Sequence, residues 1–189
     1  MPPTLVGDEC RPSITSLRAV VYITIMRKAY RYRLYPSKSQ VTLLEQTLEI
    51  CRWVYNDTLA LRKTAWEQEQ HSISLYETNK ILTQWKKERP DLNRVHSQVL
   101  QNVQVRVDLA FKSYFRRVKA GKEPGYPRFK GKGRYDSFTY PQSGFKLDGD
   151  RLHLSKIGDV KIILHRPIEG TIKTCTVMRS STGKWYACF

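Results

Sequence analysis

Residues 27–37 read RKAYRYRLYPS, and this stretch decides the fold because it joins a strand to the start of a helix. Apolar side chains at alternate positions face one way and Arg31 and Arg33 face the other, which predicts a half-buried strand with a basic outer face. Pro36 ends this strand, and Ser37 is suited to cap the helix that follows. The strand has no neighbouring partner in the sequence, and a lone strand is not stable in water. We therefore expect it to pair with strands much later in the chain.

The next segment is predicted to be helical. Apolar residues recur at spacings of three and four over residues 41–59, which indicates one long amphipathic helix. Residues 74–77, SLYE, form a capping-box pattern and predict a second helix that runs to about residue 87. A third helix is expected over residues 92–120, and Gly121 provides a natural end for it.

The pattern then changes from helical to extended. Residues 121–134, GKEPGYPRFKGKGR, fit no packed element and predict a loop. Beyond it, alternation of period two indicates strands, including a hairpin around residues 148–150, DGD. Together with the first strand, these later strands predict an α+β fold, namely a small antiparallel β-barrel with a three-helix lobe inserted after its first strand. The later strands are expected within residues 145–154, 160–164, 172–178 and 184–189.

Residues 1–26 show no clear period, and we expect them to be an N-terminal extension, with Met26 as a candidate for the true start. Its most apolar part, residues 17–26, is too short to span a membrane and is preceded by acids rather than cations, unlike a signal peptide. None of the four cysteines lies at C-x-x-C spacing, so we expect reduced thiols in a cytoplasmic protein. The expected divisions after the extension are the first strand at 27–36, a helical lobe at 37–122, a basic loop at 123–134 and the rest of the barrel at 135–189.

The net charge favours a polyanionic partner. Lys and Arg number 33 against 17 Asp and Glu, which gives a formal net charge of +16 on 189 residues. Nucleic acid is the usual partner of such a basic domain, and solubility alone is the alternative explanation. The clustering of the cations favours nucleic acid.

A basic and aromatic stretch is the main candidate for binding. Cations at this density neutralise phosphates, and the interleaved rings can stack on bases or close the core. A solvated helix end with a flexible loop is the alternative. The cations are Lys112, Arg116, Arg117, Lys119, Lys122, Arg128, Lys130, Lys132 and Arg134; the rings are Tyr126, Phe129 and Tyr135; and Arg31, Arg33, Lys156, Lys161 and Lys173 extend the basic surface.

Enzyme signatures are absent from the sequence. Nuclease chemistry commonly needs clustered carboxylates that hold two metal ions, and no such cluster is apparent. Asp148 and Asp150 fit a tight turn, and Asp159 is expected in another. The histidines lack a second ligand at metal-binding spacing. We therefore expect no catalytic residue, no metal and no cofactor. Gln98, Gln101 and Gln104, at three-residue spacing, could pair with adenine, but exposed helix polarity is the default explanation for them.

An ordered string of short motifs resembles the TnpB family, also called OrfB. These transposon proteins, often described as transposases, are RNA-guided DNA nucleases related to type V CRISPR effectors. The resemblance runs from about residue 27 to the end of the sequence, and the order and spacing of the motifs make it specific. The motifs are YRLYP at Tyr32–Pro36, RWVYN at Arg52–Asn56, SQVLQ at Ser97–Gln101, GYPRFK at Gly125–Lys130, LSKIGDVK at Leu154–Lys161, GTIK at Gly170–Lys173 and KWY at Lys184–Tyr186.

The resemblance implies a fold and a set of contacts. It implies a wedge-type β-barrel with an inserted recognition lobe, which together grip a guide RNA, the guide–target heteroduplex and a short motif beside the target DNA. The RNA-gripping role falls on the basic loop and the barrel face. The motif-reading surface falls on Tyr76, Ser97, Gln98, Gln101 and Thr139.

This sequence also departs from the family. The catalytic RuvC-like domain of the family begins just after a strand like residues 184–189, and a zinc ribbon follows it. We therefore expect this chain to be the truncated N-terminal half of a TnpB-like protein, which binds RNA and DNA, has no membrane partner and does not cut. A split nuclease completed by a downstream fragment and a stand-alone basic RNA-binding protein are the alternatives.

Overall fold

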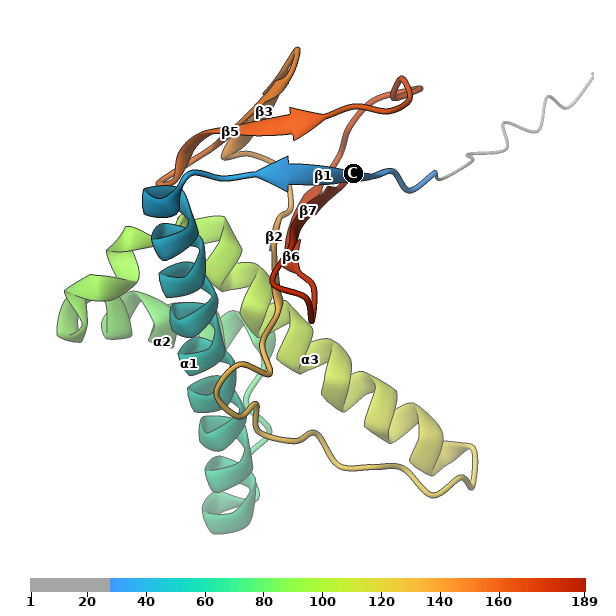
Figure 1. The fold of residues 1–189 in the computed structure, drawn as a ribbon. Helices are drawn as coiled ribbons and strands as arrows, with labels where there is room; N and C mark the ends of the chain where they lie inside the picture. Colours follow the sequence, from blue (N-terminus) through green and yellow to red (C-terminus); the bar gives the residue numbers. More distant parts are fainter. Residues whose placement is uncertain (1–27) are drawn as a thin grey trace, which may run out of the picture.

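The computed structural model describes residues 28–189, and the expectations for residues 1–26 lie outside the described residues. Figure 1 shows a curved sheet at one end of the molecule and the helices at the other. The elements in chain order are β1 (Arg31–Tyr35), α1 (Lys38–Glu69), α2 (Leu75–Glu88), a 3₁₀ helix (Pro90–Arg94), α3 (Ser97–Lys119), β2 (Ser137–Tyr140), β3 (Phe145–Asp148), β4 (Arg151–Leu154), β5 (Gly158–Ile163), β6 (Cys175–Arg179) and β7 (Trp185–Cys188).

β1 lies inside the sheet, between β7 and β5, although it comes first in the chain. Leu34 is opposite Trp185 on β7 and Ile162 on β5. Reciprocal backbone hydrogen bonds of 2.9 Å between Tyr30 and Phe189 extend the β1–β7 pairing past both strands. The predicted long-range pairing of the first strand is thus confirmed.

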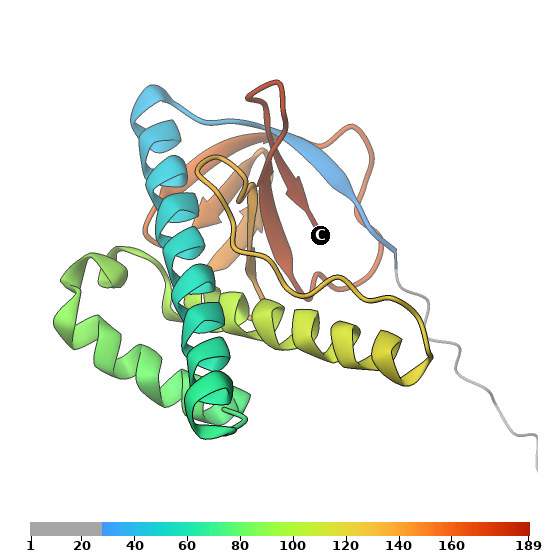
Figure 2. The same ribbon diagram turned by 90° about the horizontal axis from the view of Figure 1, so that it is seen from below.

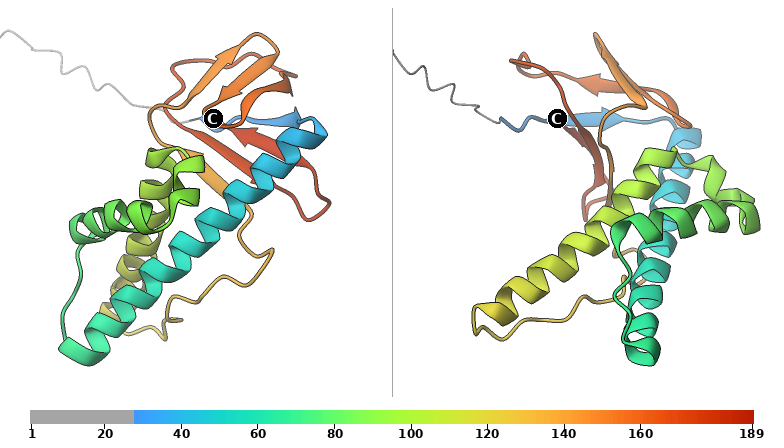
Figure 3. Two further views of the ribbon diagram at one scale, coloured as in Figure 1. Left: turned by 90° about the vertical axis from the view of Figure 1, so that its left-hand side faces the viewer. Right: turned by 180° about the vertical axis from the view of Figure 1, so that it is seen from behind.

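The sheet contains seven strands in the order β2-β6-β7-β1-β5-β4-β3, and every neighbouring pair is antiparallel. It curls strongly (Figures 2 and 3), and within residues 28–189 no ladder joins the two edge strands, β2 and β3. The sheet is therefore nearly closed and barrel-like, and the predicted α+β class is confirmed.

Some predicted boundaries were wrong. The third helix was expected from residue 92, but a 3₁₀ helix occupies Pro90–Arg94 and Val95 is extended, so α3 begins only at Ser97. Asp159 was expected in a turn but lies in β5. No strand was singled out at residues 137–140, where β2 forms with Phe138 and Tyr140 buried.

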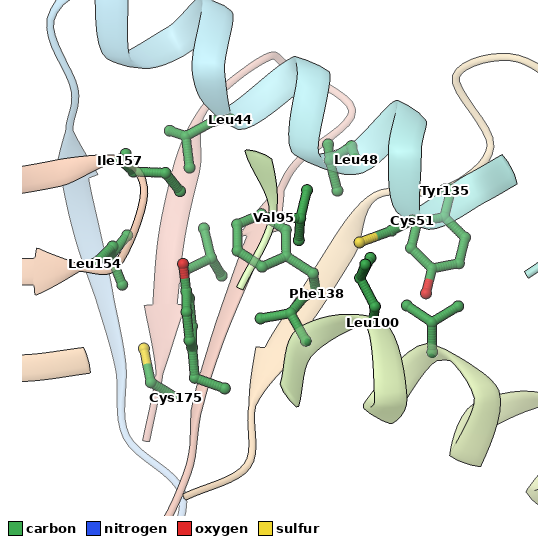
Figure 4. Close-up of a cluster of buried hydrophobic side chains, with 14 of the residues drawn as sticks. Leu44, Leu48, Cys51, Val95, Leu100, Tyr135, Phe138, Leu154, Ile157 and Cys175 are labelled. Carbon is green, nitrogen blue, oxygen red and sulfur yellow. The ribbon is translucent and has the colours of Figure 1, made fainter. Parts of the chain in front are cut away.

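The core is formed where the first half of α1 meets the sheet and α3. Both capping boxes that begin α1 and α2 are present, with Ser37 and Ser74 as the N-caps. Leu44, Leu48 and Cys51 point from α1 into the core (Figure 4). The helical stripe predicted from residue 41 is therefore the face that packs on the barrel.

The sequence predicts an apolar stripe along the third helix, and α3 buries only part of it; the stripe is Val99, Val103, Val107, Ala110, Tyr114 and Val118. Val99, Val103 and Val107 are buried as expected. In the last three turns the buried residue is Phe111, whereas Val118 is exposed. The end of α3 thus leaves apolar surface uncovered. Gly121 has a positive φ of 64° just beyond the helix, as expected for a helix-terminating glycine.

Candidate nucleic-acid interface

A groove of about 720 Å³ brings together two segments that the sequence marked separately. Arg33 reaches it from β1 and Arg134 from the end of the basic loop. Arg179, the last residue of β6, is a third arginine in its lining. We call this the arginine groove. Arg179 was not among the residues singled out from the sequence, where it falls between the strands expected at 172–178 and 184–189.

The cations of β1 are held by aromatic rings on the same face of the sheet. The register places Arg33 opposite Tyr186, whose hydroxyl accepts a hydrogen bond of 3.4 Å from the Arg33 guanidinium. The Arg33 guanidinium also lies 5.3 Å from the ring centroids of Tyr35 and Tyr186, and that of Arg31 lies 4.0 Å from Tyr186. Such cation–π contacts orient the guanidinium groups without neutralising them.

Carboxylates compensate part of the positive charge of the arginine groove. Glu45 and Asp136 line it, and the Arg179 guanidinium lies 3.2 Å from Glu45. The Nε atom of Arg33 is buried and has no hydrogen-bond partner within residues 28–189. The groove therefore holds three cations and two carboxylates, and carries a net positive charge.

The basic loop is tied to α1 at Lys130. The Asn56 side chain accepts from the Lys130 N–H at 2.8 Å and donates to its carbonyl at 2.9 Å. Arg52 donates to the same carbonyl at 3.2 Å. Figure 1 shows the loop running back from the end of α3 toward α1. Arg128, Phe129, Lys132 and Arg134 remain exposed around this anchor, with Phe129 54% exposed.

The other two rings of the stretch have different surroundings. Tyr135 is buried, and Arg106 donates to its hydroxyl at 3.3 Å. Burial raises the pKa of Tyr135 above its ordinary value. Tyr135 therefore closes the core, and Tyr126 packs in T-shaped contacts against Phe111 and Tyr114. Of these three rings, Phe129 and Tyr126 are exposed, and Phe129 is the one without a ring contact among residues 28–189.

The glutamines of α3 fall into three environments. Gln104 is buried and donates to the Thr78 carbonyl at 2.8 Å, so the possibility that all three glutamines are exposed was wrong. Gln98 accepts from the Ser143 N–H at 3.2 Å and from its hydroxyl at 3.0 Å. Gln101 is exposed. Helix periodicity could not distinguish them, because the partner of each lies on another element.

Of the remaining motif-reading positions, Ser97 lies beside Gln98 and the other two lie elsewhere. The Lys86 ammonium donates to the Ser97 hydroxyl at 2.7 Å, and burial lowers the pKa of Lys86. Tyr76 is exposed near the start of α2, ten residues or about 15 Å along the helix from Lys86. Thr139 is on β2, where its hydroxyl accepts from Arg106 at 2.9 Å. The five positions therefore do not gather at one point.

The remaining predicted cations are spread over two surfaces. Lys161 is exposed on β5, opposite Tyr35. Arg116, Arg117 and Lys119 are exposed at the end of α3, without ion-pair partners in the described part of the chain. These three form a cationic tip that is separate from the arginine groove.

The carboxylates of the described chain are not arranged as a metal site. Residues 28–189 contain no group of three or more His, Cys, Asp or Glu side chains that could hold a metal ion. Asp159 lies 2.7 Å from the ring of His153, and Asp108 lies 3.1 Å from Arg62 and 2.8 Å from Lys112. None of the helices described here has the length and apolarity to cross a membrane.

Comparison with known proteins identifies related chains. The family model of a helix-turn-helix domain, HTH_OrfB_IS605, matches residues 26–71. In the described part of that range, the structure has β1 followed by one continuous helix, α1, that ends at Glu69.

Two relatives carry names that describe a proposed RNA-guided DNA endonuclease. One, from Streptomyces pristinaespiralis, is 34% identical over 167 residues, which cover 85% of this chain and 40% of the relative. The other, InsQ from Escherichia coli K12, is 33% identical over 163 residues, which cover 84% of this chain and 39% of the relative. The chain thus spans about two fifths of the length of these relatives.

Proposed function

Over the region that it shares with these relatives, the chain is a member of the TnpB/OrfB family of transposon-associated, nucleic-acid-binding proteins, and from this premise we propose that residues 28–189 bind a guide-type RNA and its DNA target. The observation that carries the proposal is the arginine groove, where Arg33, Arg134 and Arg179 converge from three separate segments. Arginine is suited to phosphate because its planar fork can donate two parallel hydrogen bonds.

Binding to phosphates predicts a particular dependence on salt. Each phosphate that the protein neutralises releases counterions, so affinity falls linearly on a log–log plot against salt concentration. The exposed cations of the basic loop continue the arginine groove toward α1, where Asn56 anchors the loop. The backbone of a bound RNA would follow this path from the β1 end of the sheet to the middle of α1.

The test compares the groove with a matched surface elsewhere. Arg134→Ala combined with Arg179→Ala should weaken binding of a fluorescent RNA hairpin with a single-stranded tail, and should lower the salt slope by about 1.4 to 1.8. The control combines Lys87→Ala with Lys146→Ala, which removes two exposed cations outside the groove lining. Equal slopes for the groove variant and the parent protein would contradict the proposal.

We also propose that the start of α3 contacts the DNA motif beside the target. Gln101 is exposed there, and Ser97 and Gln98 precede it on the first turn. A glutamine amide can donate and accept at one adenine edge in the major groove. Gln101→Ala should reduce discrimination between duplexes that differ at one base beside the target, while nonspecific duplex binding stays unchanged.

We further propose that this chain binds without cutting. Residues 28–189 contain no group of three or more candidate metal ligands, and Asp108 and Asp159 are already paired with Arg62, Lys112 and His153. Incubation of the chain with Mg²⁺, a transposon-end RNA and a matching duplex should leave the duplex intact. Specific cleavage that a chelator abolishes would contradict this proposal.

A further inference from the structure

A small aromatic pocket lies at the far end of the helices from the arginine groove. Its volume is about 170 Å³, and its principal lining residues are Arg62 and Trp66 of α1, Phe111, Tyr114 and Phe115 of α3, and Tyr126 of the basic loop. Glu45 at the groove and Trp66 at the pocket are 21 positions apart on α1, which corresponds to about 30 Å. One nucleotide could not occupy both.

The rings of the pocket pack on one another and leave one side open. The Tyr126 centroid lies 5.7 Å from Phe111 and 5.3 Å from Tyr114, both in T-shaped contacts. The Phe115 centroid lies 5.2 Å from Tyr114 and 6.5 Å from Phe111. Phe111 is buried at the base of this cluster. The cluster thus holds two exposed rings, Phe115 and Tyr126, against the buried ring of Phe111.

The open side exposes large apolar surface that the fold does not use. Trp66 is 53% exposed and Phe115 is 54% exposed, on two different helices that line the same pocket. Exposed apolar groups that cluster around a hollow mark a binding site more often than scattered ones do. The pocket therefore has the features of a site for a flat apolar group.

Cations surround the pocket. The Arg62 guanidinium lies 4.5 Å from the Phe111 centroid and is held by Asp108. Lys119 follows Phe115 by four positions and Arg117 follows Tyr114 by three, so each cation is a neighbour of a pocket ring on the helix surface. Two carboxylates on the helices that line the pocket are engaged, since Asp108 binds Arg62 and Lys112, and Glu67 lies 3.7 Å from Lys63.

We propose that this pocket binds one unpaired base of the bound RNA, with the cationic tip on the adjoining phosphates. This proposal rests on the RNA-binding function proposed above. A base offers the flat π-face that stacks on Trp66 or Phe115, and its phosphates carry the charge that Arg117 and Lys119 neutralise. Duplex RNA offers no such base, because its bases are stacked inside the helix.

A second copy of the chain fits the pocket less well. Each copy carries a net charge of +16, so two cationic tips would repel each other. A stable protein–protein interface also buries about 800 Å² on each partner, which is far more than one pocket of this size offers. Both considerations favour an anionic ligand with a single inserted ring.

The experiment compares two RNA ligands, and it compares substitutions in the pocket with a control substitution outside the pocket. The full chain is titrated with single-stranded oligo(A) of about 12 nucleotides and with a blunt RNA duplex. Trp66→Ala combined with Phe115→Ala should weaken single-strand binding roughly tenfold, leave duplex binding unchanged and leave the salt slope unchanged. Trp66→Phe combined with Phe115→Tyr keeps both rings and should retain parental affinity. Leu109→Ala is the control, since Leu109 is an exposed apolar residue of α3 that does not line the pocket.

Three outcomes would overturn this inference. One is parental affinity of the double alanine variant for oligo(A), and another is an equal loss for oligo(A) and for the duplex. The third is a change of oligomeric state: if the parent protein sediments as a dimer and the double alanine variant as a monomer, the pocket binds a second copy of the chain. The arginine-groove variant separates the two proposals: if it loses RNA affinity while the pocket variant keeps it, the pocket inference fails and the proposed function stands. A parent protein that binds neither RNA would overturn both.

Discussion

Asn56 on α1 holds the backbone of Lys130 through two hydrogen bonds, one in each direction, at 2.8 and 2.9 Å. Asn56 belongs to the motif RWVYN and Lys130 to the motif GYPRFK, and the two are 74 residues apart in the sequence. An amide side chain is suited to this position because it carries both a donor and an acceptor. The interaction fixes the middle of an irregular loop to a helix and so positions the exposed cations on either side.

Asn56→Ala is expected to release the loop. The loss of two partly buried hydrogen bonds should lower the free energy of unfolding by about 1–3 kcal/mol, measured by urea denaturation. Trypsin should then cut faster at Arg128 and Lys132, as followed by mass spectrometry. Asn56→Asp keeps the acceptor but turns a carboxylate toward the Lys130 carbonyl, so it should also release the loop. Unchanged cleavage rates in both variants would contradict an anchoring role.

The basic loop should contribute to RNA binding mainly through charge. Replacing Arg128, Lys130, Lys132 and Arg134 by Ala should lower the slope of log affinity against log salt by about 0.7 to 0.9 for each phosphate that the variant no longer neutralises. Phe129→Ala should weaken binding with the slope nearly unchanged, because an exposed ring contributes stacking rather than ion release. Parental affinity and slope for the quadruple variant would mean that this segment is only a solvated loop.

The ion pair between Arg62 and Asp108 is mostly buried, with side chains 12% and 11% exposed. Asp108→Asn should therefore lower the free energy of unfolding by roughly 3 kcal/mol, because it leaves the Arg62 charge buried without its partner. Replacing both residues, as in Arg62→Met with Asp108→Leu, should recover part of that loss. A double variant less stable than Asp108→Asn would contradict this account. Urea denaturation at neutral pH measures the free energy of unfolding of the parent protein, of Asp108→Asn and of the double variant.

Glu77 should make the start of α2 sensitive to acid. Hydrogen bonds from the Ser74 hydroxyl and N–H lower the Glu77 pKa from 4.5 to about 2. Since the folded-state pKa is the lower one, the contribution to stability is fully present above about pH 4.5 and is lost as the pH falls toward 2. The stability difference between the parent and Glu77→Ala should therefore shrink over that range. A difference that is constant from pH 6 to about pH 2 would exclude this role for the ionised carboxylate.

The features that the sequence predicted well depend on local chemistry. The capping boxes at Ser37 and Ser74 form within four residues, and the alternation of β1 follows from its own side chains. The pairing of β1 with distant strands was also predictable, because an unpartnered strand must find a partner. Local rules of this kind apply whatever the rest of the chain does.

The features that were missed depend on partners from other elements. Gln104 is buried where it donates to Thr78 of α2, and Arg179 of β6 lines the groove beside Glu45 of α1. The strand β2 is only four residues long and follows a loop, so its alternation of two buried rings was too brief to stand out. Neither helix spacing nor composition contains this information.

The central place of β1 sets the order in which the molecule can be completed during synthesis. Leu34 is paired with Trp185, 151 positions later, so this pairing must wait until β7 has left the ribosome. At about 5–20 residues per second, this wait lasts on the order of ten seconds. α1, α2 and α3 emerge within it and can pack on one another first. β1 is therefore the first strand to be made, and both of its places in the sheet are filled by strands from the other end of the described chain, β5 first and β7 last.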